Sequence, residues 1–217
     1  MDCGEATYGQ IVRFFGHEKA AHVLSNLIAV YISHLHADHH IGLIGLLQGR
    51  QHAIERTRSD AGPVFLIAPH QINFWLKQYH YSFERIRQYF KLFSNVNLFE
   101  KEKPDSELLT GLNLKSIVTT YVRHCPSAFG VSLTTADGFK LTYSGDTMPC
   151  VSLIDIGRDS DLLIHEATME DGMEEEAKKK THCTISQVND SFSLSCFEQM
   201  KNVHCEFFSR RSKWAVR

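Results

Sequence analysis

The sequence lacks the features that mark membrane-spanning, secreted or strongly basic proteins. No apolar stretch in its 217 residues is long enough to span a bilayer, and no secretory or Arg-rich targeting segment precedes its first motif. The formal net charge of −2 gives no overall basic signature, so any contact with nucleic acid must be local. Hydrophobic content of 43% and no evident internal repeat predict one globular domain with a sizeable core.

Cysteine is present but is not arranged in pairs. The six cysteines form no CxxC motif and are scattered along the chain: Cys3, Cys125, Cys150, Cys183, Cys196 and Cys205. Without a signal peptide, this pattern predicts reduced thiols in an intracellular protein. Residues 1–7 resemble the end of a strand and its turn, so we expect a chain that is truncated at its amino end.

Helix and strand patterns alternate along the chain, which predicts an α/β fold with a mixed sheet. Buried strands are expected at residues 27–32 and 63–68, an alternating strand at residues 114–122 and a further strand at residues 161–165. Asp137-Gly138 predicts a hairpin between residues 130–135 and 139–143. Helices are expected at residues 9–24, 42–49, 71–93 and 170–180, with a loop at residues 51–62.

Aromatic residues recur at near-helical spacing in the third of these predicted helices. Together with Ile86, the stripe comprises Phe74, Trp75, Tyr79 and Phe90. We predict that it packs in the core; a base-stacking platform is the alternative.

The strongest chemical signal is the run of residues 33–42, directly after the first buried strand. It places His34, His36, Asp38 and His39 within six residues. Imidazoles and a carboxylate at this density relieve their mutual repulsion by binding a cation, whereas a His-rich loop without metal is the alternative. One tetrahedral ion cannot comfortably take all four side chains, so the run predicts two ions roughly 3.5–4 Å apart.

A single loop cannot complete two metal shells, so further ligands must come from distant segments. His124 and Asp146 both follow predicted strands, where α/β sheets usually place chemistry. The two oxygens of Asp146 could bridge two cations. Taken alone, Asp146 would be interpreted as a turn aspartate that caps its own backbone.

These motifs in combination resemble the metallo-β-lactamase superfamily, and within it tRNase Z, most closely the carboxyl-terminal half of the long form. The resemblance spans residues 2–187. It is carried by the metal loop and by Asp2-Cys3-Gly4-Glu5, Val122-Arg123-His124-Cys125, Ser144-Gly145-Asp146-Thr147, His165-Glu166-Ala167-Thr168 and Thr181-His182.

The resemblance implies an α/β fold of the αββα sandwich type, incomplete here, with a nuclease domain at residues 1–187 and a divergent tail at residues 188–217. It implies a zinc-dependent endoribonuclease that removes the 3′ trailer from precursor tRNA by two-metal hydrolysis. By this analogy one zinc is held by His34, His36, His124 and Asp146. The other zinc is held by Asp38, His39, the bridging Asp146 and one further histidine.

The same resemblance assigns the reacting groups. Asp38 would hold or deprotonate the nucleophile, and His182 would protonate the leaving ribose oxygen. His165 and Glu166 would shape and support the site. The implied partner is precursor tRNA, with no membrane contact and with a homodimer left open; the implied location is the nucleus or mitochondrion, with the cytoplasm as an alternative.

The match ends after residue 187, where the family's last zinc histidine should follow. His204 lies at about the right distance from Asp146 and is the candidate ligand. Residues 207–211 resemble the family segment more weakly, and there Phe207 stands where the family has histidine. A replaced tail without this ligand is the alternative. The chain could therefore be an impaired homologue that binds one zinc and acts as an interaction or decoy module, or another hydrolase of the same fold.

Overall fold

The computed structural model describes residues 1–99 and 105–193. The chain forms two compact units, unit 1 (Met1–Asn97) and unit 2 (Leu98–Arg217), and the short helix η2 (Asn95–Leu98) covers the boundary along the chain. Within the described ranges no helix combines the length and apolar character needed to cross a membrane. The predicted tail boundary at residue 187 falls inside a helix, α9 (Ile185–Ser193).

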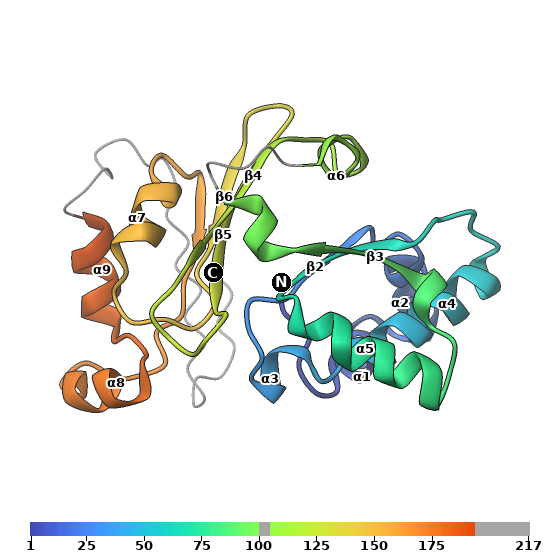
Figure 1. The fold of residues 1–217 in the computed structure, drawn as a ribbon, viewed down its shortest axis with the longest axis horizontal. Coiled ribbons are helices and arrows are strands. Elements are labelled where there is room, and N and C mark those ends of the chain that lie inside the picture. The colour runs from blue at the N-terminus through green and yellow to red at the C-terminus, as the bar shows by residue number, and fades with distance from the viewer. Residues whose placement is uncertain (100–104, 194–217) are drawn as a thin grey trace. The chain divides into compact units, whose positions relative to one another are not determined.

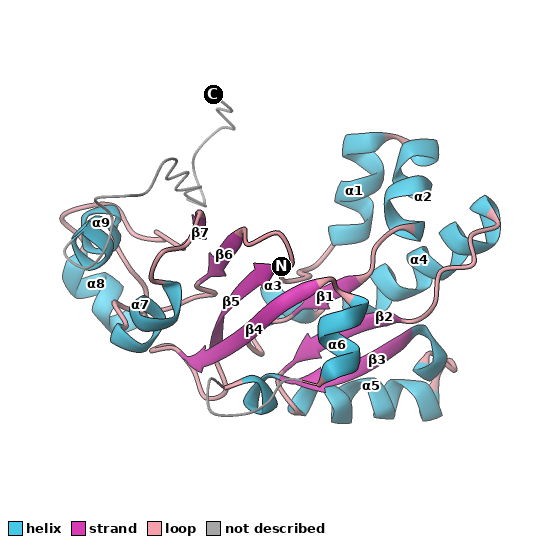
Figure 2. Ribbon diagram, turned by 90° about the horizontal axis from the view of Figure 1, so that it is seen from above, coloured by secondary structure: helices cyan, strands magenta, loops and turns pink. Residues whose placement is uncertain are grey.

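Unit 1 is a parallel three-stranded sheet with helical connections. Its elements are α1 (Thr7–Phe15), α2 (His17–Ser25), β1 (Ala29–Tyr31), α3 (Ala37–His40), α4 (Leu43–Thr57), β2 (Val64–Ala68), α5 (Gln71–Ser82), η1 (Arg87–Tyr89) and β3 (Phe90–Ser94). The strand order is β1-β2-β3 (Figure 2). Parallel pairing requires crossovers, which α4 supplies between β1 and β2, and α5 with η1 between β2 and β3.

Three predictions for unit 1 are wrong in extent. The helix predicted at residues 9–24 is divided by Gly16, whose φ of 74° ends α1 before α2 begins. Helix α4 continues to Thr57, into the predicted loop. The helix predicted to residue 93 ends at Ser82, because Phe90 and its neighbours pair in parallel with β2, and this long-range pairing overrides the local periodicity.

The core of unit 1 lies between the sheet and its helices. Buried apolar side chains come from β1, β2, α2, α4 and α5, including Leu24, Val30, Leu47, Leu66 and Leu76. The predicted aromatic stripe is divided by this core: Ile86 and Phe90 are buried, Trp75 and Tyr79 pack against the core, and Phe74 is 67% exposed. The prediction of core packing is therefore wrong for Phe74.

Unit 2 contains the second sheet, in the order β4-β5-β6-β7. Its elements are α6 (Ser106–Gly111), β4 (Leu114–Tyr121), β5 (Phe129–Thr135), β6 (Lys140–Tyr143), α7 (Val151–Gly157), β7 (Leu162–Ile164), α8 (Glu174–Lys180) and α9. The predicted hairpin is confirmed as β5-β6, and β7 pairs in parallel with β6 in an otherwise antiparallel sheet. The expected mixed sheet is therefore present in this unit.

Helices α7 and α9 lie on one side of this sheet (Figure 1). They share a small core in which Leu153 of α7, Leu163 of β7 and Val188 of α9 are buried. At Gly130 of β5, an added Cβ would lie 2.6 Å from Leu153 Cδ1, so glycine allows α7 to approach the strand closely.

Candidate metal centre

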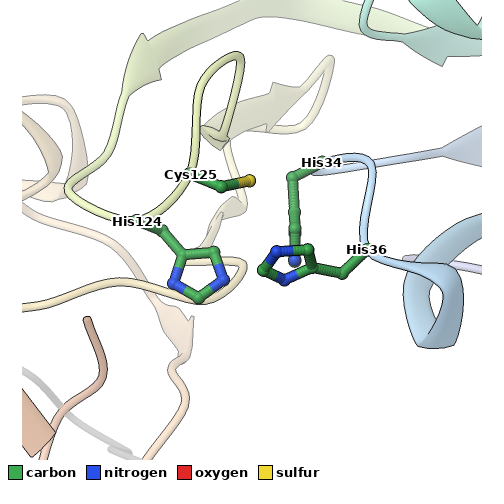
Figure 3. Close-up of side chains that lie close together, drawn as sticks. All are labelled: His34, His36, His124 and Cys125. Atoms are coloured by element: carbon green, nitrogen blue, oxygen red, sulfur yellow. The ribbon is translucent and has the colours of Figure 1, made fainter. Parts of the chain in front are cut away.

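The His-rich run follows β1, as predicted, and forms a loop that ends in the one-turn helix α3. His34 is buried, and its ring lies near that of His36 (Figure 3). The ring centroid of His34 is 4.7 Å from that of His36 and 4.1 Å from that of His39. The Asp38 carboxylate lies 3.8 Å from His39 Nε2. Unit 1 therefore gathers three imidazoles and one carboxylate on a single loop.

Asp2 fixes the orientation of two of these imidazoles. Its carboxylate accepts hydrogen bonds from His39 Nδ1 at 2.7 Å, from Ser33 N at 2.7 Å and from Ser33 Oγ at 2.8 Å. Because the single hydroxyl proton of Ser33 is donated to Asp2, Ser33 Oγ accepts from His34 Nδ1, which lies 2.9 Å away. In both histidines the lone pair that a metal needs therefore resides on Nε2.

The segment that carries Asp2 is held against the metal loop by backbone contacts. Cys3 N donates to His39 O at 2.7 Å, and Gly42 N donates to Cys3 O at 3.0 Å. An added Cβ would lie 2.1 Å from Asp38 O at Gly4, and 1.9 Å from Gly4 O at Gly42. Glycine is required at both positions because backbone atoms approach so closely.

Unit 2 gathers a second group of candidate ligands after its strands. His124 and Cys125 share the loop that follows β4 (Figure 3), and Asp146 follows β6. His124 Nε2 lies 3.8 Å from Asp146 Oδ2, and the rings of His124 and His182 lie 5.0 Å apart. Ligand atoms of His124, Asp146 and His182 lie within 4.8 Å of one another, close enough to hold one ion.

Thr181 fixes the orientation of His124. Its carbonyl oxygen and its hydroxyl oxygen both lie 2.9 Å from His124 Nδ1, and the hydroxyl donates to Lys180 O. The proton of His124 is therefore on Nδ1 and the lone pair on Nε2. Thr181 ends α8 with a φ of 57°, a left-handed cap that turns the chain directly into His182.

The buried carboxylate of Glu166 organises the rest of the group in unit 2. Its Oε1 accepts from His182 Nδ1 at 2.8 Å and from Thr147 N at 2.7 Å. Its Oε2 accepts from Thr168 N at 3.1 Å and Thr168 Oγ1 at 2.7 Å. Glu166 thus connects the turn that carries Asp146 to the loop that carries His182, and it places a negative charge beside His182.

His165 is buried, and its Nδ1 donates to the carbonyl oxygen of Glu166 at 2.7 Å. Burial lowers the pKa of His165, so the ring is neutral near pH 7. Its contacts are those of a supporting residue.

The structure brings together His34, His36, Asp38 and His39 within unit 1, and His124, Asp146 and His182 within unit 2. His204 lies outside the described residues. Sequence analysis assigned no role to Asp2 or Thr181, although both stand in quoted motifs. No local signal in the sequence marks Asp2, because its partners Ser33 and His39 lie 31 and 37 residues away.

The donor set fits zinc. Imidazole nitrogen and carboxylate oxygen are the ligands that zinc takes in catalytic sites, and zinc-bound histidines typically donate their second N–H to a carboxylate or carbonyl oxygen. His39 on Asp2 and His124 on Thr181 follow this pattern.

The chain is similar to several known proteins. The family model described as "Anti-Pycsar protein Apyc1" matches residues 1–206. "Ribonuclease Z, mitochondrial" of Drosophila melanogaster is 53% identical over 86% of this chain, and "Zinc phosphodiesterase ELAC protein 2" of Rattus norvegicus is 45% identical over the same share. The chain spans only 24% of the length of each of these two relatives.

Solved structures give the same fold. A long form RNase Z from yeast has a TM-score of 0.81 and 26% identity, covering 100% of this chain and 33% of that chain. The human short-form tRNase Z has a TM-score of 0.70 at 23% identity, covering 96% and 80%, and a metallo-β-lactamase fold protein of Bacillus subtilis has a TM-score of 0.64 at 16% identity, covering 88% and 69%. The predicted fold class is confirmed by these likenesses.

Proposed function

The chain belongs to the metallo-β-lactamase-fold family described as Anti-Pycsar protein Apyc1, with ribonuclease Z proteins as homologues, and we propose that it is a zinc-dependent endoribonuclease that removes the 3′ trailer from precursor tRNA. The observation that carries the proposal is the orientation of the candidate ligands. His34, His39 and His124 each bind a protein oxygen through Nδ1, which places the metal-binding lone pair on Nε2. A buried carboxylate also holds a further histidine, His182, beside His124.

The proposal assigns two zinc ions. The first would be held by His34, His36, His124 and Asp146. The second would be held by Asp38, His39 and the second oxygen of Asp146, together with His204. When bound, zinc supplies Lewis acidity, which makes water a nucleophile near neutral pH and offsets charge on the phosphate.

The protein's own side chains move the protons. The Asp38 carboxylate accepts a proton from the attacking water. His182, held through Nδ1 by Glu166 Oε1, donates its Nε2 proton to the 3′ oxygen of the leaving ribose. The buried negative charge of Glu166 stabilises the doubly protonated imidazole that makes this donation, and it aims Nε2 away from Glu166.

The substrate and location follow from the relatives' names. Ribonuclease Z homologues indicate an RNA substrate, and precursor tRNA is the substrate proposed here. The Drosophila relative is named mitochondrial, so the mitochondrion is the proposed location, with the nucleus as the other candidate. A homodimer is the proposed assembly to be tested by sedimentation.

The proposal is tested by zinc stoichiometry together with cleavage. Native mass spectrometry of the folded chain should give two bound zinc ions. Asp146→Ala should lose bound zinc, whereas Asp155→Ala, which removes an exposed carboxylate on α7, is the control and should keep both ions. Precursor tRNA with a 3′ trailer should be cut by the wild-type chain. His182→Ala should keep its zinc but lose roughly 10²- to 10⁴-fold in kcat, the usual contribution of a general acid.

Each other outcome contradicts part of the proposal. One bound zinc and no cleavage would support the impaired homologue, which acts as an interaction or decoy module. Two zinc ions with hydrolysis of a thioester or lactam, and with precursor tRNA left intact, would support another hydrolase of this fold. Zinc loss in both Asp146→Ala and Asp155→Ala would mean that the Asp146 effect reports unfolding rather than ligation.

A further inference from the structure

Helix α5 exposes aromatic rings that the core of unit 1 does not use. The exposed fractions are 67% for Phe74, 76% for Tyr81 and 79% for Phe83, whereas α5 buries only Ile72 and Leu76. Contiguous exposed apolar side chains often mark an interaction site, whereas single exposed apolar residues are common on any protein surface. The exposed positions are aromatic and the buried ones aliphatic, which favours a partner that offers flat rings.

The exposed rings and a cation share one surface. Phe74, Lys77 and Tyr81 follow one another at i, i+3 and i+7, which places them on one side of α5. Beyond the helix, the Phe83 ring stacks on Tyr79, with centroids 5.3 Å apart and planes at 30°. Tyr79 is at i+5 from Phe74 and so lies on another side of α5, which leaves Phe83 outside this surface. We call Phe74, Lys77, Tyr81 and Arg87 the α5 face.

The segment that follows α5 is fixed by hydrogen bonds. His80 Nδ1 accepts from Ile86 N at 3.0 Å and from Arg87 N at 3.3 Å, and this closes the turn that contains Phe83. Arg87 Nη1 donates to Asn73 Oδ1 at 3.0 Å. This bond holds the Arg87 guanidinium against α5, at the residue that precedes Phe74. The rings and the cation are therefore presented on an ordered surface.

The charge of this region is opposite to that of the chain. Residues 70–87 carry Lys77, Arg85 and Arg87 against the single acidic residue Glu84, while the whole chain has a net charge of −2. Glu84 in turn accepts a hydrogen bond from Gln48 of α4. Aromatic rings interleaved with cations are the arrangement by which proteins hold single-stranded nucleic acid without reading its sequence.

Helix α5 also contacts the metal loop within unit 1. The Trp75 ring meets the His40 ring edge to face, with centroids 5.1 Å apart, and His40 Nδ1 donates to His36 O at 2.9 Å. A strand that leaves the metal loop toward α5 would thus meet Phe74, the neighbour of Trp75, before Tyr81. This direction fits the unpaired nucleotides that lie beyond a cleavage point.

We propose that the α5 face binds single-stranded RNA, with the bases of the 3′ trailer stacked on Phe74 and Tyr81 and the backbone phosphates paired with Lys77 and Arg87. The assignment of the trailer rests on the proposed function. The binding of single-stranded RNA does not, so the two can be tested separately.

The first experiment measures binding of a fluorescein-labelled RNA strand of about ten nucleotides, within the usual site size, to the zinc-loaded full chain by fluorescence anisotropy. Phe74→Ala and Tyr81→Ala should each weaken binding roughly 5- to 100-fold, the usual effect of removing one stacking ring. Tyr81→Phe keeps the ring and should keep the affinity. Phe14→Ala removes a ring that is 83% exposed on α1 and should change nothing.

Charge is tested by salt. Lys77→Gln should weaken binding and reduce the slope of log K against log salt by about 0.7, the value for one phosphate contact on a single strand. Circular dichroism and zinc content should match the wild type in every variant, because all the substituted side chains are exposed. A ring variant that fails this check is replaced by the Leu variant at the same position, which removes the ring and keeps an apolar side chain.

The second experiment compares precursor tRNAs with a one-nucleotide and a ten-nucleotide trailer. Phe74→Ala/Tyr81→Ala should raise KM for the long trailer and leave kcat and the short-trailer KM unchanged. The inference is overturned, and the proposed function stands, if the wild type cleaves both substrates and the double variant keeps the wild-type KM for the long trailer and the wild-type affinity for the RNA strand. Strand binding that depends on the rings without cleavage of either substrate would support the face and refute the nuclease.

A protein partner is the remaining occupant. If the ring variants change the sedimentation of the chain and leave RNA affinity unaltered, the α5 face is an interface between two copies, and the inference is wrong.

Discussion

Glu166→Gln is the substitution for which the structure makes the sharpest prediction. The change keeps the shape of the side chain and removes one acceptor oxygen and the negative charge. Oε1 accepts from Thr147 N and His182 Nδ1, and Oε2 accepts from Thr168 N and Thr168 Oγ1. Whichever way the amide is placed, its NH₂ group must face at least one buried backbone N–H.

The magnitude follows from this conflict. The best placement puts the amide oxygen near Thr168 and the NH₂ group against Thr147 N, which leaves one buried donor unpaired at a cost of about 1–3 kcal/mol. The remaining bonds lose their charge assistance, so the free energy of unfolding should fall by roughly 2–4 kcal/mol in total. For a chain of this size the expected fall in Tm is about 5–15 °C.

The same placement changes the chemistry of His182. The NH₂ group donates to His182 Nδ1, which moves the ring proton to Nε2 and removes the negative charge that favours double protonation. His182 is then a weaker proton donor to the leaving oxygen, so kcat for cleavage of precursor tRNA should fall.

The assay is thermal unfolding followed by circular dichroism, with zinc removed so that metal loss is not measured. Glu176→Gln on α8 is the matched control, because the side chain of Glu176 is 39% exposed and its carboxylate pairs only with Lys180 among the contacts described, at 3.0 Å. This substitution should leave Tm unchanged. A fall in Tm for Glu166→Gln no larger than that of the control would refute the view that Glu166 joins the two loops.

Three further predictions test the metal loop and its support. Asp2→Asn should weaken zinc binding 10- to 100-fold in competition with a chelator, as loss of a carboxylate that orients metal ligands typically does, whereas the exposed Asp60→Asn should not. Gly42→Ala should lower the free energy of unfolding in urea by about 1–3 kcal/mol, because its Cβ would lie 1.9 Å from a backbone oxygen; Gly45→Ala in α4, with open space at its Cβ, should instead raise it by about 0.5–1 kcal/mol. Burial raises the pKa of the Cys3 thiol from 9.0 to about 11, so as the pH rises this thiol ionises first in the unfolded chain. The contribution of the neutral thiol to the free energy of unfolding is complete below pH 9 and is lost by pH 11. Urea unfolding should show a loss of roughly 2 kcal/mol across this range that Cys3→Ala lacks, and equal slopes in both proteins would contradict the assignment.

The sequence by itself determined the elements whose signals are local. His34, His36, Asp38 and His39 are close in space because they are close in the chain, directly after a buried strand. The β5-β6 hairpin follows from Asp137-Gly138, whose backbone preferences form a tight turn without help from distant residues.

The tertiary structure alone decided the features that depend on distant partners. Asp2 orients the metal loop across 31 and 37 residues of chain, and Thr181 orients His124 across 57, so no local pattern could assign these roles. The residues of β3 have a spacing compatible with a helix, and pairing with β2 made them a strand. Phe74 and Phe90 carry the same side chain in one stripe, and only the packing of unit 1 buried Phe90 and left Phe74 on the surface, because burial is set by what lies opposite a residue and not by the residue itself.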